Sequence, residues 1–116
     1  MHLYKTKKHM KRFGQIIHLK PEGANEYIIQ HAAVWPGVLK MITECNIQNY
    51  SIYKKDNVLF SYFEYVGNDF EGDMARMSAD LETQRWWDVV KPLMEPIETR
   101  NVGEFWADME EIFHLD

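Results

Sequence analysis

The chain has 116 residues, of which 46% are apolar, 14% aromatic and 27% charged. This composition predicts one globular domain and excludes an intrinsically disordered chain. The net charge is −5, and the residues beyond Lys20 hold seven basic and eighteen acidic side chains, so we expect no nucleic-acid partner. No apolar run approaches the roughly 20 residues that cross a bilayer, so we expect no membrane partner. The single cysteine, Cys45, excludes an internal disulfide and favours the reducing cytoplasm.

The basic residues are concentrated at the start of the chain. Residues 1–20 hold six of the thirteen basic side chains and no acidic one. No apolar segment follows these charges, as a secretory signal would require. We expect residues 1–10 to form a basic, flexible N-terminal tail and residues 11–116 to form a single domain.

The first half of the chain predicts a strand followed by a broken helix. The β-favouring run from Arg12 to Leu19 predicts the first strand. Glu22 to Asn25 open a helix, with Asn25 as the expected N-cap. The dipeptide Trp35-Pro36 interrupts the helical pattern, because proline disfavours a helical residue before it. A second helical piece begins at Pro36 and ends near Asn46.

The second half begins with two strands, Ile47 to Lys54 and Val58 to Tyr65, which a turn at residues 55–57 joins as a hairpin. The second of these strands is apolar on both sides, so we expect it in the middle of a sheet. Further elements are expected over these segments: helices over Asp69 to Ser78 and Glu82 to Leu93, a loop over Met94 to Gly103, and a last strand over Glu110 to Leu115.

The order β-α-β-β-α-β predicts an α+β fold of the ferredoxin-like kind, with an antiparallel sheet that carries its helices on one face. The other face of the sheet would then be uncovered. Domains of this kind commonly hide that face by pairing two protomers, so we expect a homodimer.

Tyr27 and His31 are four residues apart and share one face of the predicted helix. Histidine exchanges protons near neutral pH, so this pair favours an acid–base site that lines a pocket. The alternative is a helix that merely packs on the sheet, with His31 as a satisfied core or edge residue. Spacing alone favours the alternative.

The segment Gln84-Arg85-Trp86-Trp87 is the second candidate. Adjacent tryptophans on a helix point about 100° apart, so Trp86 and Trp87 are unlike a simple core pair. Indole faces stack well on the C–H face of a sugar ring, although one core tryptophan and one interface tryptophan would fit equally well. Tyr50 lies on the second strand, where a tyrosine usually serves packing.

We expect no metal and no cofactor. The five histidines and one cysteine show no metal-ligand spacing. The sequence has no G-x-G-x-x-G motif, phosphate-binding loop or nucleophile elbow, so nucleotide cofactors and acyl-serine chemistry have no support.

Taken in order, four segments resemble the L-rhamnose mutarotase family. They are Glu26-Tyr27-x-x-x-His31 followed by Trp35-Pro36, then residues 49–53 (NYSIY), residues 84–87 (QRWW), and residues 110–115 (EEIFHL). The resemblance implies a dimeric α/β barrel type of fold, a monosaccharide as the small-molecule partner, and interconversion of the α and β anomers of L-rhamnose or a related 6-deoxy aldose. It assigns His31 as the acid–base residue and Tyr27, Tyr50, Trp86 and Trp87 as substrate-binding residues.

The chemistry suits these residue types. Mutarotation delivers a proton to the ring oxygen and removes one from the anomeric hydroxyl, with neither a metal nor a redox step. We expect His31 to act as general acid to the ring oxygen, Tyr27 and Tyr50 to orient hydroxyls or relay the second proton, and the tryptophans to form the wall that stacks on the sugar.

Two other functions stay open from the sequence. One is a small cofactor-independent or haem-binding monooxygenase on the same dimeric fold, with His31 as the iron ligand. The other is a non-catalytic sugar-sensing module.

Overall fold

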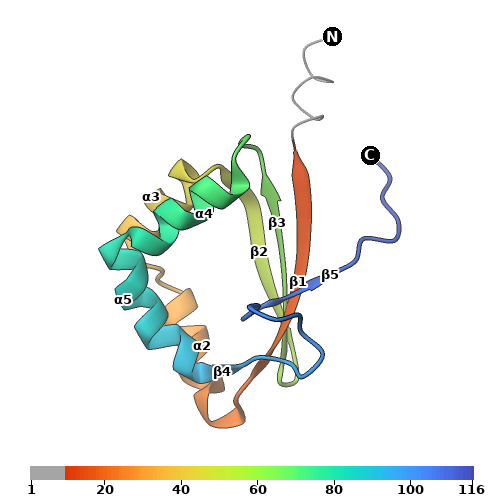
Figure 1. Ribbon diagram of the computed structural model, residues 1–116. Coiled ribbons are helices and arrows are strands. Elements are labelled where there is room, and N and C mark those ends of the chain that lie inside the picture. The colour runs from red at the N-terminus through yellow and green to blue at the C-terminus, as the bar shows by residue number, and fades with distance from the viewer. Residues whose placement is uncertain (1–9) are drawn as a thin grey trace.

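The computed structural model describes residues 10–116, and the expected tail therefore lies, except for Met10, outside the described residues. Its elements, in chain order, are β1 (Lys11–Leu19), η1 (Pro21–Gly23), α2 (Ala24–His31), α3 (Pro36–Glu44), β2 (Ile47–Lys55), β3 (Val58–Tyr65), α4 (Phe70–Ala79), α5 (Leu81–Val90), η2 (Lys91–Leu93), β4 (Met94–Glu95) and β5 (Ala107–Met109). The helices gather on one face of the sheet (Figure 1).

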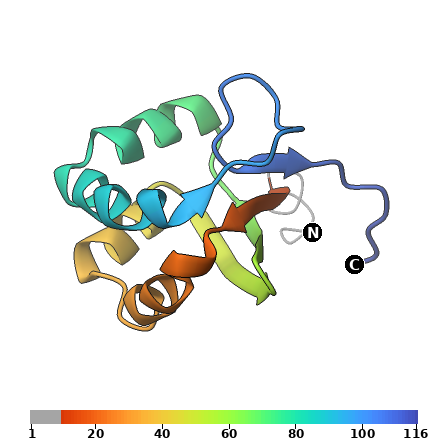
Figure 2. The same cartoon turned by 90° about the horizontal axis from the view of Figure 1, so that it is seen from below.

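The sheet has the order β2-β3-β1-β4, β5 also pairs with β1, and each pairing is antiparallel. The α+β, ferredoxin-like prediction is confirmed, and β3 lies between β2 and β1 as its apolar sequence indicates. We call the face toward the helices the inner face and the opposite one the outer face. Figure 2, seen along the sheet from below, shows the helices on one side and the C-terminal segment on the other.

Local chemistry explains where the helices begin and end. The chain leaves α2 after His31 and starts α3 at Pro36, with Trp35 in an extended conformation before the proline, as expected. Asp69 caps α4 by accepting a hydrogen bond from the amide of Gly72, and Asp80 caps α5 by accepting one from the amide of Thr83, each at 3.0 Å. These bonds satisfy amides that have no partner within their own helix.

Three expectations about element bounds are wrong. Asn25 does not cap α2, because Pro21–Gly23 forms a 3-10 turn that leads into the helix and Gly23 takes the N-cap position. The second long helix ends at Val90 and continues only as the short 3-10 turn η2, since Pro92 has no N–H to donate. Met94–Glu95 pairs with β1 as a two-residue strand inside the expected loop.

The last strand lies earlier than its sequence indicates. It covers Ala107–Met109, whereas the expected strand over Glu110 to Leu115 is absent and residues 110–116 run away from the sheet (Figure 1). Arg12 holds the root of this arm through two hydrogen bonds to the Glu111 carboxylate, at 2.7 and 3.1 Å. Beyond it Ile112, Phe113 and Leu115 are at least 80% exposed. Their apolar pattern predicts a strand, but packing against residues 10–116 does not bury these side chains.

The main core lies between the inner face and the helices. It joins Ile17, Leu19 and Leu59 of the sheet to residues of α2, α3 and α5, including Tyr27, Val38, Trp86 and Val90. A second cluster, built on Ile47, Phe63 and Tyr65, receives Phe70, Met74 and Met77 from α4. Within residues 10–116, no helix is both long enough and apolar enough to cross a membrane.

Candidate active site

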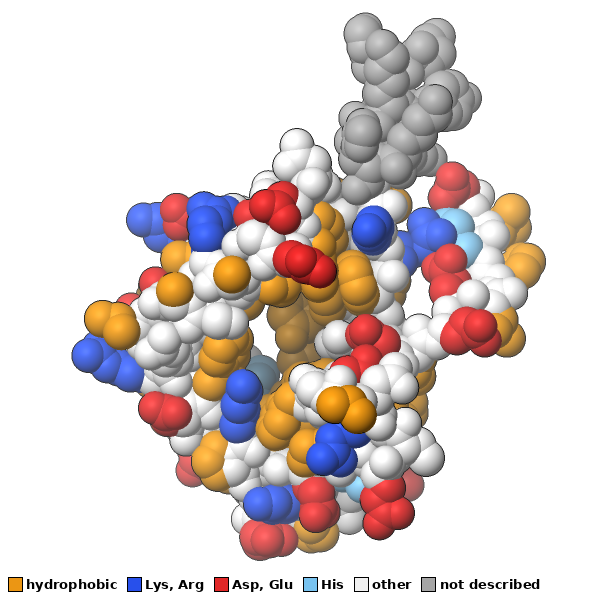
Figure 3. Space-filling view, viewed as in Figure 1, with side chains coloured by type: hydrophobic (Ala, Val, Ile, Leu, Met, Phe, Trp, Pro, Cys, Tyr) orange, Lys and Arg blue, Asp and Glu red, His pale blue; other side chains and the backbone are white. Residues whose placement is uncertain are grey.

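A cavity of about 710 Å³ lies between the helices and the inner face. Figure 3 shows the hollow with hydrophobic side chains in its walls. Its volume falls in the range of about 300–1,000 Å³ that is typical of small-molecule sites. Most of the lining is apolar or aromatic, and the polar side chains along it are Gln15, Tyr27, His31, Thr43, Gln48, Asn49, Tyr50, Thr83 and Lys91. No carboxylate from the described part of the chain lines the cavity.

His31 is the last residue of α2, and its ring is fixed by one hydrogen bond. Nδ1 lies 2.8 Å from the backbone carbonyl oxygen of Tyr27. A carbonyl oxygen only accepts, so Nδ1 carries the proton and donates it, which leaves the lone pair of the neutral ring on Nε2. Burial lowers the pKa of His31 from its usual value, while the bond to Tyr27 opposes that shift. The neutral form with a basic Nε2 therefore dominates near pH 7.

Tyr27 lies one helical turn before His31, and the two rings stack with centroids 3.9 Å apart. Burial raises the pKa of the Tyr27 phenol well above its usual range, and the charge of Tyr50 raises it further. Burial also raises the pKa of Tyr50 to about 12, although 42% of that residue stays exposed. Neither hydroxyl makes a hydrogen bond within residues 10–116. Both phenols remain protonated and free to donate to a ligand.

A β-bulge aims Tyr50 into the cavity. The register of β2 against β3 shifts between Gln48 and Ser51, so Asn49 and Tyr50 together oppose Phe63. Asn49 adopts a positive φ of 51° and donates a hydrogen bond to Glu64 at 2.6 Å. Strict alternation from the inward residue Ile47 would place Tyr50 on the outer face. The extra residue returns Tyr50 to the inner face, where its ring centroid lies 5.5 Å from that of Phe63.

Trp86 and Trp87 both line the cavity, from α5. Trp86 is buried, and its ring meets the rings of His31 and Trp35 edge to face at 5.2 and 5.4 Å. Trp87 is half-buried, and the ammonium of Lys91 lies 4.4 Å from its ring centroid. Trp86 therefore forms the wall next to the imidazole, whereas one face of Trp87 is already covered by a cation.

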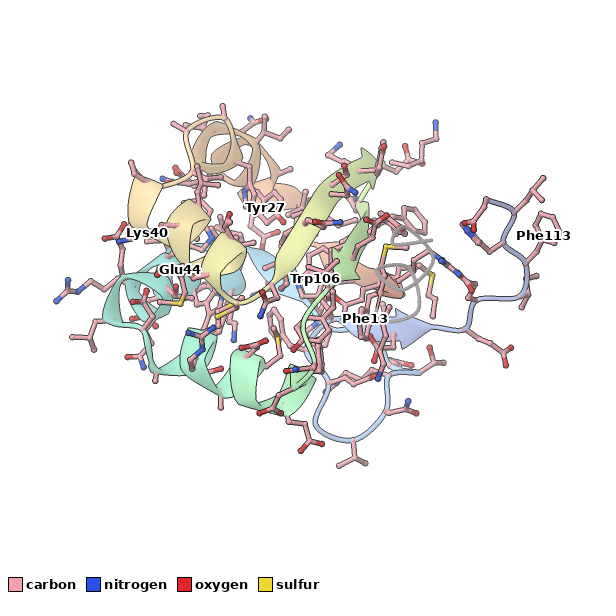
Figure 4. All side chains as sticks on the ribbon, turned by 90° about the horizontal axis from the view of Figure 1, so that it is seen from above. Phe13, Tyr27, Lys40, Glu44, Trp106 and Phe113 are labelled. Carbon is pink, nitrogen blue, oxygen red and sulfur yellow. The ribbon has the colours of Figure 1, made fainter. Side chains whose placement is uncertain are left out.

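The structure brings all five predicted site residues to one cavity: Tyr27, His31, Tyr50, Trp86 and Trp87. Figure 4 shows Tyr27 between α2 and the sheet, while Lys40 and Glu44 lie along α3 away from the cavity centre. His18 is exposed and lies outside the lining. Within residues 10–116, no three His, Cys, Asp or Glu side chains group to hold a metal ion.

The lining residues that sequence reasoning missed include Gln15, Lys91, Phe105 and Trp106. The sequence could have indicated Gln15. Alternate residues of the first strand share a face, and Gln15 is the one polar residue in the inward series Phe13, Gln15, Ile17 and Leu19. Phe105 and Trp106 come from the segment before β5, which has no regular structure. Their arrival at the cavity depends on how that segment folds back, and no periodicity encodes this.

Comparison with solved structures defines the class of fold. The crystal structure of an L-rhamnose mutarotase from Formosa agariphila superposes with a TM-score of 0.69 at 20% identity, covering 91% of this chain and 99% of that one. A tetracenomycin F2 cyclase from Streptomyces glaucescens, a type-II polyketide cyclase, superposes with a TM-score of 0.68 at 9% identity, with 91% and 97% covered. At such identities the likeness shows a shared ferredoxin-like α+β fold.

The sequence then gives the family. The L-rhamnose mutarotase family model matches residues 12–115. An L-rhamnose mutarotase of Phocaeicola vulgatus is 35% identical over 109 residues, which cover 92% of this chain and all of that protein. One from Ligilactobacillus salivarius is 36% identical over 110 residues, with 90% and 97% covered. This chain belongs to the L-rhamnose mutarotase family.

Proposed function

We propose that the protein is a sugar mutarotase that interconverts the α and β pyranose anomers of L-rhamnose or a related 6-deoxy aldose. The observation that carries this proposal is the pairing of a free, basic Nε2 on His31 with two unpartnered phenols in one aromatic-walled cavity. Family membership supports it, because the relatives described above carry the name L-rhamnose mutarotase.

The state of His31 sets the order of proton transfers. With Nδ1 held by the Tyr27 carbonyl, neutral Nε2 first accepts the proton of the anomeric hydroxyl. The imidazolium then donates to the ring oxygen as the C1–O bond of the ring breaks, which yields the open aldehyde. Both oxygens are bonded to C1, so one nitrogen near C1 reaches both. Rotation about C1–C2 and reversal of these steps closes the other anomer.

The phenols and indoles bind the sugar in this scheme. Tyr27 and Tyr50 donate hydrogen bonds to sugar oxygens, since their raised pKa values keep them protonated. Trp86 packs against one face of the ring beside the imidazole. An uncharged sugar is compatible with a lining that has no carboxylate from residues 10–116.

Exchange spectroscopy tests the activity directly. Saturating the H1 signal of one L-rhamnose anomer should transfer saturation to the other faster when the protein is added at catalytic concentration, and D-glucose should respond less. Unchanged transfer for L-rhamnose and for other 6-deoxy aldoses would refute the proposal. A Soret band on adding haem, without sugar exchange, would favour the monooxygenase alternative.

We further propose that two copies pair through their outer faces. That face presents Tyr53, Phe60 and Met109, which are 65%, 38% and 41% exposed. The arm beyond Glu111 adds three exposed apolar side chains, and Phe113 stands well clear of the fold (Figure 4). Apolar surface on this scale is typical of an interface. Sedimentation should show a dimer at micromolar concentration, and a monomer would refute this pairing.

The cytoplasm is the compartment we propose, because the one cysteine, Cys45, is a buried free thiol and reduced thiols are typical of that compartment.

A further inference from the structure

One row of side chains on the inner face holds three polar residues, whereas the neighbouring inward residues on β1 and β3 are apolar. Four residues face one another across β2, β3, β1 and β5 in this register: Ile52, Ser61, Gln15 and Asp108. The inward residues that flank this row are apolar. They are Phe13 and Ile17 on β1, and Leu59 and Phe63 on β3. We call Ser61, Gln15 and Asp108 the floor row.

Gln15 is oriented by Asp108. Its Nε2 donates a hydrogen bond to Oδ1 of Asp108 at 2.7 Å. With the amide nitrogen turned toward that carboxylate, Oε1 of Gln15 makes no hydrogen bond within residues 10–116. Gln15 lines the same cavity as His31 and Tyr27, but from the sheet rather than from α2. The cavity therefore has an acid–base residue on its helical side and an oriented acceptor on its sheet side.

Ser61 shows that the floor row is not optimised for stability. Its Oγ is buried and has no hydrogen-bond partner within the described chain. A buried polar group without a partner is unfavourable by about 1–3 kcal/mol. An apolar side chain at positions 15 and 61 would match the surrounding face and avoid that penalty. Ser61 itself does not line the cavity, whereas Gln15 does and keeps a free acceptor there, so Gln15 is the member of the floor row that can meet a ligand.

We propose that Gln15 determines substrate specificity by accepting a hydrogen bond from one ring hydroxyl of the sugar, with Asp108 as the residue that positions its amide. This inference rests on the proposed function and deepens it. It predicts that the substrate carries a hydroxyl on the side of the ring that faces the sheet. An analogue without that hydroxyl leaves the acceptor unpaired and binds less well.

The test combines a protein change with a ligand change. L-rhamnose and its monodeoxy analogues at C2, C3 and C4 are compared on the wild type and on Gln15→Leu, by ligand-observed NMR for Kd and by saturation transfer for the exchange rate. Gln15→Leu should weaken L-rhamnose binding about tenfold. On the wild type, one deoxy analogue should bind about tenfold more weakly than L-rhamnose. On Gln15→Leu, the same analogue and L-rhamnose should bind equally well. Gln15→Met replaces Gln15→Leu if the latter lowers the melting temperature.

The matched control is Gln30→Leu. Gln30 also donates its amide to a carboxylate, Glu26, at 2.6 Å, but on the surface of α2 and outside the cavity lining. It should leave Kd and the exchange rate unchanged. If Gln15→Leu also leaves both unchanged while the wild type exchanges anomers, this inference alone is wrong. If the wild type exchanges no sugar, the proposed function and this inference are both wrong.

Asp108→Ala separates positioning from direct contact. It should weaken binding less than Gln15→Leu does, because the amide remains but is no longer held. In the Gln15→Leu background it should have no further effect on Kd, since there is no amide left to position. Additive losses would mean that Asp108 acts on stability or on the sugar by itself, which would overturn its assigned role.

Discussion

Adjacent residues of the same four strands build two opposite surfaces. On the inner face, one register row runs through Ser61 and Gln15 to Asp108 and is polar. On the outer face, the next row runs through Tyr53, Phe60 and Ile16 and is apolar. A sheet with one solvated face normally shows the reverse, with apolar residues inward and polar residues outward.

This inversion locates the two functions that we propose. On the inner face Gln15 offers the cavity an acceptor that no residue of the described chain uses, and a ligand can pair with it. Apolar groups on an uncovered face need a partner that covers them. The core itself is confined to the two clusters between sheet and helices. The polar row on the inner face and the apolar row on the outer face both depart from the usual pattern. Packing among residues 10–116 does not explain either of them.

The largest effect on the inner face should come from His31→Asn. Asparagine keeps a polar side chain of smaller size but cannot exchange protons near pH 7. The loss of a general acid–base group typically lowers the rate about 10²–10⁴-fold, measured by saturation transfer. The circular dichroism spectrum should stay that of the wild type. A folded His31→Asn variant with the full exchange rate would show that another group moves the protons.

On the outer face, Phe60→Arg should break the proposed dimer. An arginine there would place a charge among the apolar side chains of the proposed interface, and an unpaired buried charge is unfavourable by about 3 kcal/mol or more, which corresponds to a dissociation constant about 100-fold higher. Sedimentation velocity measures the change. The control is Ile29→Arg on α2, where Ile29 is 63% exposed and away from the outer face. Equal effects of the two variants would contradict pairing through this face.

The pH dependence of exchange should follow His31. Its pKa is lowered by burial, and the neutral form starts the reaction, so the rate should be full above about pH 6.5 and fall as pH drops through the lowered pKa. The free energy of unfolding should also fall as the pH drops below about 6.5. The reason is that the imidazole binds a proton at a higher pH in the unfolded chain than in the folded protein. Exchange rate and urea unfolding against pH measure both. If the exchange rate of His31→Asn still fell at low pH in the same way, the titrating group would be a residue other than His31.

Much of this architecture is readable from local sequence signals. Residues 58–65 carry apolar side chains on both sides and form a strand in the middle of the sheet, with the bounds that the sequence predicts. Tyr27 and His31 share a cavity because helical spacing keeps them on one face. These features depend on short-range periodicity and on the backbone limits of proline, and both are present in a single sequence.

Other features depend on contacts between distant segments. The inward position of Tyr50 requires a bulge at Asn49, and the short strand β5 forms where β1 offers an edge rather than where the apolar residues lie. The arm with Ile112, Phe113 and Leu115 has a strand-like sequence, but none of residues 10–116 covers these side chains. Periodicity predicts which residues favour a strand, and tertiary contacts decide which of them pair.

Two tyrosines of β2 allow the inner and outer faces to be compared within one strand. Tyr50 lies on the inner face and lines the cavity, whereas Tyr53 lies on the outer face and is 65% exposed. Tyr50→Phe removes only a hydroxyl and should weaken L-rhamnose binding about five- to tenfold, the value of one hydrogen bond. Tyr53→Phe should leave Kd unchanged. Similar losses in both variants would mean that the effect comes from strand stability rather than from sugar contact.

The smallest effect should come from Lys91→Met. The Lys91 ammonium lies 4.4 Å from the ring centroid of Trp87 and 5.1 Å from that of Phe105, and methionine keeps the aliphatic stem while removing the charge. A cation over an aromatic ring contributes about 0.5–1 kcal/mol at exposed sites, so the free energy of unfolding in urea should fall by about that amount. Lys40→Met, at an exposed position of α3, should change nothing. Because the proposed substrate is uncharged, the exchange rate should stay within about twofold of the wild type. A tenfold loss of exchange at unchanged stability would show instead that the ammonium contacts the sugar, and the cavity wall beside Trp87 would then belong to the binding site as a hydrogen-bond donor.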